Sequence, residues 1–166
     1  MATPAQNVVS DQKRELLRHA LATLAYRGGK AVRGVPAGFA EFRAGEGVRT
    51  PGEILAHIGD LLDWAVSLVE GNQRWHDSAP LAWDEGVKRF YAGTKALEDA
   101  LSSGAAVAAS PESLFQGPIA DALTHIGQIA ILRRLAGHPV KGENYFKADI
   151  VTGRVGPEQA APKREF

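Results

Sequence analysis

Apolar residues recur along this chain with the period of an α-helix, and patterns typical of β-strands are nearly absent. The helical period is found in four stretches, at about residues 10–29, 50–70, 81–102 and 117–136. A spacing of three and four residues puts the apolar side chains on one face of each helix, and that face must be buried against another element. Four amphipathic helices of this length predict an all-α four-helix bundle.

Capping and breaking residues mark the ends of these helices. Thr50 is followed by a proline and, three residues later, by Glu53, which predicts a capping box at the start of the second helix. Ser10 is the predicted N-cap of the first helix, and the Gly28-Gly29 pair is predicted to weaken or end it. Gly137 is predicted to end the fourth helix.

The pattern predicts a single domain over residues 1–166. The helical bundle is expected at about 10–137, and residues 138–166 are expected to form an irregular tail, because they are rich in glycine and proline. This tail is predicted to lie on the bundle or on a partner subunit. Tyr145 and Phe146 are its predicted anchors, since they are large aromatic residues in a segment with few others.

Composition narrows the classes of function. The chain has 19 Lys and Arg against 19 Asp and Glu, so it lacks the basic excess of a general nucleic-acid binder. It has no cysteine, which excludes disulfides, thiolate zinc sites and cysteine nucleophiles. No apolar run approaches the roughly 18 residues of a membrane span. The N-terminal residues resemble no secretion signal, so we expect a cytoplasmic protein that binds neither nucleic acid nor membrane.

The fourth predicted helix carries an unusual group of polar residues. Asp121, His125 and Gln128 fall within an arc of about 60° on a helical wheel, while almost all other positions of this helix are apolar. A helix that is apolar nearly all round is expected to be buried. Asp121 and His125 are four residues apart, so their side chains lie one turn apart on the same face.

His57 is the corresponding exception in the second helix, where it shares the apolar arc with Trp64. If this face meets that of Asp121 and His125, two imidazoles and one carboxylate could hold Zn²⁺, Ni²⁺ or Fe²⁺ and leave coordination positions open for water or substrate. Both groups are in the N-terminal halves of their helices, so they lie at the same height along the bundle only if the second and fourth helices run roughly parallel. The alternative interpretation is structural, with a buried His–Asp hydrogen bond and one satisfied core histidine.

Three further residues are candidates for the surroundings of such a site. Gln128 lies one turn beyond His125 and could orient a water or ligand, or simply make a buried polar contact. Thr94 interrupts the apolar stripe of the third helix and could face the same cavity, or bond its own helix backbone. Trp64 could line the pocket from the arc that holds His57. No residue is assigned a catalytic role from the sequence.

Two segments carry a resemblance to a known family. Residues 50–60, Thr-Pro-Gly-Glu-Ile-Leu-Ala-His-Ile-Gly-Asp, and residues 123–129, Leu-Thr-His-Ile-Gly-Gln-Ile, resemble the second and fourth helices of the DinB/YfiT-like family. This resemblance implies a four-helix bundle with up-down-down-up topology, in which offset, crossing helices bring the metal ligands together. The family's three histidines fall on His57, Asp121 and His125, so one histidine is replaced here by aspartate, which could shift selectivity towards harder ions.

The resemblance also implies a range of functions. Some members of the family resemble metal-dependent transferases that use a low-molecular-weight thiol, and zinc or nickel, with iron as a further option, would then be the cofactor. The partners expected on this basis are a small-molecule substrate, a small thiol and a second copy of the chain in a homodimer. The alternatives are a metal-dependent hydrolase, a non-catalytic stress-response or interaction bundle with a structural metal or none, and a purely structural bundle.

Overall fold

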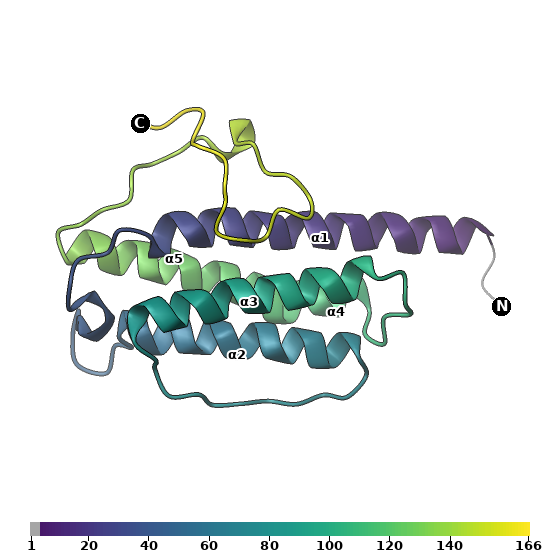
Figure 1. Ribbon diagram of the computed structural model, residues 1–166, viewed down its shortest axis with the longest axis horizontal. Coiled ribbons are helices and arrows are strands. Elements are labelled where there is room, and N and C mark those ends of the chain that lie inside the picture. Colours follow the sequence, from purple (N-terminus) through teal and green to yellow (C-terminus); the bar gives the residue numbers. More distant parts are fainter. Residues whose placement is uncertain (1–3) are drawn as a thin grey trace.

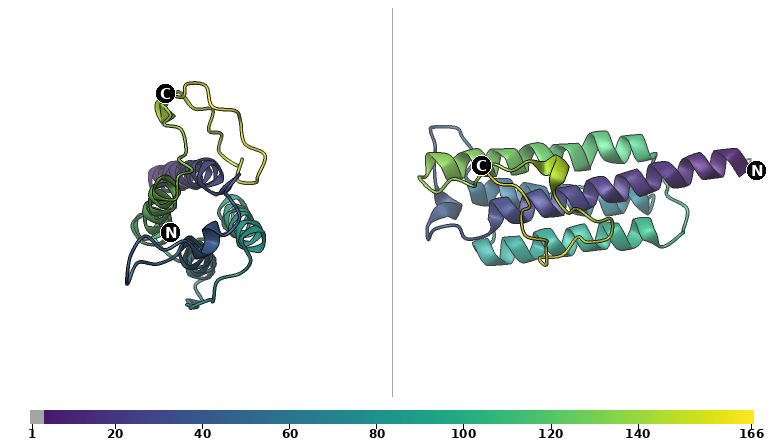
Figure 2. Two further views of the ribbon diagram at one scale, coloured as in Figure 1. Left: turned by 90° about the vertical axis from the view of Figure 1, so that its left-hand side faces the viewer. Right: turned by 90° about the horizontal axis from the view of Figure 1, so that it is seen from above.

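Four long helices lie side by side and make up most of the protein (Figure 1, Figure 2). The computed structural model describes the backbone of residues 4–166 and the side chains of residues 11–166. The long helices are α1 (Pro4–Val32), α2 (Pro51–Val69), α3 (Trp83–Ser102) and α5 (Ala120–Leu135), and the short α4 (Pro111–Leu114) precedes the last of them. No β-strand occurs in the described part of the chain, so the predicted all-α class is confirmed.

Each long helix packs against two others around a shared apolar core. Both α1 and α2 contact α3 on one side and α5 on the other, and fully buried side chains from all four fill the space between them. The core includes Leu21, Ile58, Phe90 and Ile129. Among the described residues, no helix is long and apolar enough to cross a membrane.

The start of α2 is formed by the predicted capping box. The Thr50 hydroxyl accepts a hydrogen bond from the Glu53 backbone N–H at 3.2 Å, and the Glu53 carboxylate accepts one from the Thr50 N–H at 2.6 Å. Two backbone donors that the first turn leaves unpaired are thereby satisfied. The helix ends as predicted before Gly71, which adopts a φ of +73°.

The first helix is longer than predicted at both ends. It begins at Pro4, so Ser10 is inside it rather than at its N-cap, and it continues through Gly28 and Gly29 to Val32. The glycines are needed for packing against α3. A Cβ atom at position 28 would lie 2.5 Å from the ring of Phe90, and one at position 29 would lie 2.5 Å from the hydroxyl of Tyr91.

The C-terminal end of α1 is completed by a side chain from α5. The buried guanidinium of Arg133 donates hydrogen bonds to the backbone carbonyls of Ala31, Arg33 and Gly34, and also to that of His138. Carbonyls at a helix C-terminus have no partner within the helix. Arg133 therefore supplies donors to the end of α1 from a distant part of the chain.

The fourth helical segment also begins earlier than predicted. Helical backbone starts at Pro111, continues through a π-helical turn at Phe115–Ile119 and runs on as α5 to Leu135. Pro118 lies inside this wider turn. Proline has no N–H to donate and its ring crowds the preceding turn, so an irregular turn at this position is expected.

One side of α5 is exposed, contrary to the prediction of a helix buried nearly all round. The side chains of Ile131 and Leu135 are 48% and 60% exposed, respectively. The helix contacts α1 on one side and α2 on the other, which leaves a third side facing outward. This helix therefore has more apolar side chains than are buried within one chain.

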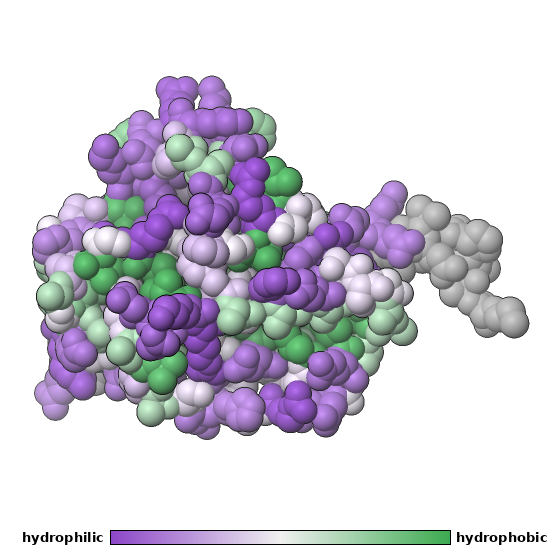
Figure 3. All heavy atoms as spheres, in the orientation of Figure 1, coloured by the Kyte–Doolittle hydropathy of each residue, from purple (hydrophilic) through white to green (hydrophobic). Residues whose placement is uncertain are grey.

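The irregular C-terminal tail lies across α1, as Figure 1 and Figure 2 show. Glu143 is buried and accepts hydrogen bonds from the Tyr26 hydroxyl at 2.7 Å and the Lys30 ammonium at 2.8 Å. Lys30 also pairs with Glu165, so one lysine holds both ends of the tail. The tail presents mainly polar side chains on the face drawn in Figure 3.

Only one of the two predicted aromatic anchors holds the tail. The ring of Tyr145 contacts that of Tyr26 edge-on at 6.4 Å and lies under the guanidinium of Arg27. Phe146 is 97% exposed, so it does not anchor the tail to the bundle, and an anchoring role on a partner subunit stays a prediction. Charged and polar groups and the buried side chain of Val155 also fix the tail, and the aromatic pattern did not reveal them.

We expect Gly28→Ala to destabilise the protein by about 1–3 kcal/mol, because Phe90 is fully buried and cannot yield to the added methyl group. The matched control is Gly127→Ala in α5, where a Cβ would meet no atom within 4 Å. That substitution should stabilise the protein by about 0.5–1 kcal/mol through helix propensity. Urea unfolding of both variants measures the difference, and an equal effect of the two would contradict the packing role of Gly28.

Candidate metal centre

Three predicted ligands from α2 and α5 converge in the structure. His57, Asp121 and His125 each offer one ligand atom, and these atoms lie within 4.8 Å of one another. The His57 Nε2 is 3.6 Å from Asp121 Oδ2, and the two imidazole rings are 4.7 Å apart between their centres. The arrangement brings together residues that are more than sixty positions apart in the chain.

The two helices that hold the group run in opposite directions (Figure 1). The expectation that a shared level requires parallel helices is therefore wrong. Its error comes from the predicted start of the fourth helix at residue 117. Since helical backbone already begins at Pro111, Asp121 and His125 lie in the middle of a longer run, opposite the first half of α2.

The hydrogen bonding of His125 prepares it to bind a cation. Its Nδ1 lies 2.8 Å from the backbone carbonyl of Asp121. A carbonyl can only accept, so Nδ1 carries a proton, and in the neutral ring the lone pair is on Nε2. Histidines that bind metals characteristically donate their other ring N–H in this way.

The environment of His57 favours its neutral form. Burial lowers the pKa of His57 most strongly, and the nearby charges of His125 and Arg49 lower it further, while Asp121 opposes the shift. The neutral imidazole is the form that ligates a metal. Two nitrogen donors and one carboxylate suit a divalent transition-metal ion, and the spacing lets one ion reach all three.

The centre is partly open to solvent. The side chain of Asp121 is 44% exposed and that of His57 is 21% exposed, whereas His125 is buried. Three ligands with an exposed side leave room for a further molecule, as in catalytic sites, while structural zinc sites are usually closed by a fourth protein ligand.

A wall of aromatic rings adjoins His57. Trp75, in the connection between α2 and α3, lies edge-on to His57 at 5.7 Å, and Trp64 lies edge-on to Trp75 at 5.8 Å. The indole Nε1 of Trp64 is buried without a hydrogen-bond partner among the described residues. Trp64 contacts Trp75 and does not line the pocket beside His57, so its predicted role there stays a prediction. Trp75 is the ring in contact with His57, and no helical pattern could have indicated it.

The other two predicted neighbours lie elsewhere. The buried hydroxyl of Thr94 donates to the carbonyls of Tyr91 and Val155, so it fixes the tail on α3 and does not face the centre. Gln128 is exposed on the outer side of α5, and the pocket beside His57 does not include it.

The pocket beside His57 has a volume of about 330 Å³ and lies between the first half of α2 and residues 77–80. Asp60, one of the residues that line this pocket, is buried and forms an ion pair with the half-buried Arg89. The carboxylate of Asp60 accepts hydrogen bonds from the Ser78 N–H and hydroxyl and from the guanidinium of Arg89. Burial alone would raise the pKa of Asp60, but these hydrogen bonds outweigh it and hold the pKa below the ordinary value.

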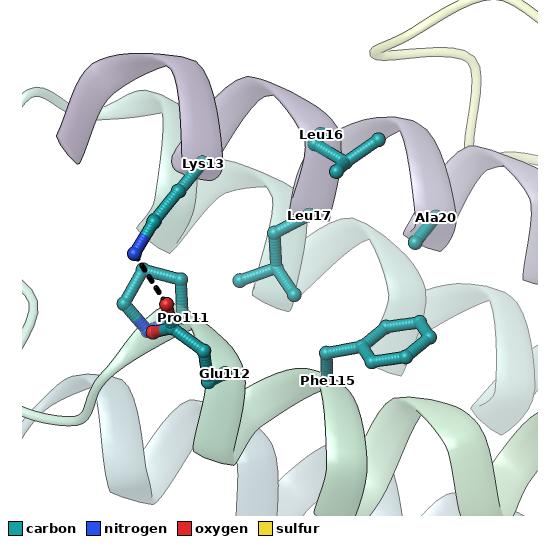
Figure 4. A pocket seen from close by; sticks show the side chains of 7 residues that line it. All are labelled: Lys13, Leu16, Leu17, Ala20, Pro111, Glu112 and Phe115. Carbon is teal, nitrogen blue, oxygen red and sulfur yellow. Dashed lines mark hydrogen bonds and ion pairs between the residues drawn. The ribbon is translucent and has the colours of Figure 1, made fainter. Parts of the chain in front are cut away.

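A separate apolar groove of about 400 Å³ lies between α1 and α4 (Figure 4). Leu16, Leu17 and Phe115 line it, and Lys13 and Glu112 form an ion pair at its rim. It contains no group of residues able to hold a metal, so it is not a second candidate for the centre. The homodimer expected from the sequence stays a prediction.

No family model, curated protein or solved structure matches the chain. The DinB-like resemblance therefore stays a prediction.

We expect Asp60→Asn to destabilise the protein by about 1–3 kcal/mol at neutral pH, because Asp60 is buried and accepts charge-assisted hydrogen bonds. Because the pKa of Asp60 is lower in the folded protein, its contribution to the free energy of unfolding is fully present above the ordinary pKa of 3.8. That contribution is lost as the pH falls through the folded-state pKa. Urea unfolding at neutral and acidic pH measures it. Asp63→Asn, at the exposed partner of the same arginine, is the control and should cost less than about 1 kcal/mol.

Proposed function

We propose that this protein binds a divalent metal ion through His57, Asp121 and His125 and uses it in catalysis. The observation that carries the proposal is the convergence of three ligand atoms within 4.8 Å. The hydrogen bond from His125 to the Asp121 carbonyl and the lowered pKa of His57 both leave imidazole nitrogens available to a cation. The partial exposure of Asp121 favours an open, catalytic centre over a closed, structural one.

Zinc and nickel are the cofactors that the donor set favours, and iron is a third option. Two imidazoles suit all three ions, and replacement of a third imidazole by the Asp121 carboxylate adds a negative charge and a harder donor. Two histidines and one carboxylate are also the donor set of many non-haem iron sites. The metal content of the purified protein decides among them.

The proposed reaction is the alkylation of a small thiol: the thiol loses its proton to solvent, its sulfur forms a bond to an electrophilic carbon of the other substrate, and the leaving group departs from that carbon with the bonding electrons. A bound divalent ion would lower the pKa of a thiol that reached it and so supply the thiolate nucleophile at neutral pH. The chain has no cysteine, so the nucleophile must come from a second substrate. The residues of the protein would hold the ion, favour the neutral form of His57, and screen one side of the centre with Trp75.

Three other parts of the proposal follow the sequence resemblance. The protein would be a DinB-like bundle with up-down-down-up topology, and the long connection between α2 and α3 supports this because it allows the two helices to run in the same direction. It would act as a homodimer. A hydrolase that uses water in place of the thiol is the alternative reaction, and a bundle with a structural metal or none is the alternative function.

Purified, untagged protein should contain about one divalent metal ion per chain, measured by elemental analysis after dialysis. His57→Ala and Asp121→Ala should each lower the metal content severalfold or more, because each removes one of three ligands. His76→Ala, at an exposed histidine on the nearby connection, is the matched control and should leave the content unchanged. Absence of metal from the parent protein, even after incubation with zinc, nickel or ferrous iron, would contradict the proposal.

The metal-loaded protein should accelerate the alkylation of a small thiol by an electrophile at neutral pH by at least about tenfold, since a larger fraction of the thiol would be thiolate. The His57→Ala variant should lose this effect. Thiol consumption measured with a panel of electrophiles tests the transferase. Hydrolysis of the same electrophiles without thiol consumption would instead favour the hydrolase.

A further inference from the structure

The pocket beside His57 combines opposite charges in a way that suggests its occupant. Its volume of about 330 Å³ is that of a small-molecule site. Its charged residues other than His57 are Arg49, Glu53, Asp60 and Asp77. Because the pocket and the metal centre share His57, a molecule held here lies next to the centre.

Only part of this charge is used within the protein. Asp60 is fully engaged by Ser78 and Arg89. Glu53 and Asp77 each have one carboxylate oxygen that accepts a hydrogen bond, from the Thr50 N–H and the Trp75 indole respectively. Their second oxygens accept none from the described residues and remain available to a ligand.

Arg49 is the complementary group. Its side chain is exposed, and it forms no ion pair or hydrogen bond with the side chains of residues 11–166. It comes directly before the N-cap of α2, so the first turn of that helix fixes the position of its backbone. The guanidinium offers the planar pair of donors that a carboxylate accepts.

We infer that this pocket binds a small zwitterion with the head group of an α-amino acid, its carboxylate on Arg49 and its ammonium on the carboxylates of Glu53 and Asp77. A molecule with a carboxylate alone would leave these two acids unpaired beside it, and a molecule with an ammonium alone would meet the charge of Arg49. The zwitterion pairs with both. Only one part of this inference rests on the proposed function, namely that the bound zwitterion is a substrate of the metal centre.

Three matched probes test the inference. Alanine carries both charges, propionate lacks the ammonium, and ethylamine lacks the carboxylate. Each is titrated at low ionic strength into the full-length protein, in metal-free and zinc-loaded forms, and binding is followed by the NMR signals of the His57 ring. Low salt matters because exposed charges are screened within about 10 Å at 0.1 M salt.

Alanine should shift the His57 signals saturably and bind at least about tenfold more tightly than propionate or ethylamine. Arg49→Gln and Asp77→Asn should each weaken alanine binding by about tenfold. Arg134→Gln is the matched control, because Arg134 is also exposed but lies in the last turn of α5 and does not line the pocket. Unchanged alanine binding in Arg49→Gln, comparable binding of either single-charge probe, or no saturable shift up to about 50 mM alanine would overturn the inference.

The two proposals fail separately in this experiment. If the protein binds metal but does not prefer alanine, only the zwitterion site is wrong. If the protein binds no metal, the metal-free titration still tests the pocket, and only its connection with catalysis is lost. A preference for alanine in the metal-free form would therefore support the pocket by itself.

Discussion

The packing of α2 against α5 is the contact on which the candidate centre depends. Neither helix contains a complete ligand set, because α2 contributes only His57 and α5 contributes Asp121 and His125. The two helices run in opposite directions, so the group forms at a single level along their line of contact. Buried apolar residues of both helices, Ile58 and Ile129 among them, stabilise the bundle in which the two helices pack and so help to position the three side chains.

The parts of this arrangement that could be predicted are those determined by nearby residues. The capping box at Thr50 and Glu53 is a local exchange of hydrogen bonds, and its residues stand three positions apart in the sequence. The ligand group joins segments more than sixty positions apart, but the types and spacing of its residues still indicated it. A polar residue within an apolar stripe, such as His57, must find a partner in the core, and the pair at 121 and 125 was the best available partner.

The predictions that failed concern contacts between distant segments. A glycine pair normally weakens a helix, but Gly28 and Gly29 let α1 approach Phe90 and Tyr91 on α3 closely, and a sequence pattern contains no such information. Arg133 similarly completes the end of α1 from a position about 100 residues away. Trp75 and Arg49 adjoin His57 from irregular connections, which have no periodicity from which their orientation could be derived.

The π-helical turn at Phe115–Ile119 makes the chain unequally tolerant of changes in length. Each residue of an α-helix turns the chain by about 100°, so one residue deleted between Asp121 and His125 would turn one ligand away from the other, whereas a one-residue deletion in the wider π-helical turn can be absorbed by its return to α-helical geometry. A change in length in the connection at residues 33–50, or in the tail, would leave both ligands facing His57. Natural variants of this protein should therefore accumulate insertions and deletions in those segments while the number of residues between Asp121 and His125 stays constant.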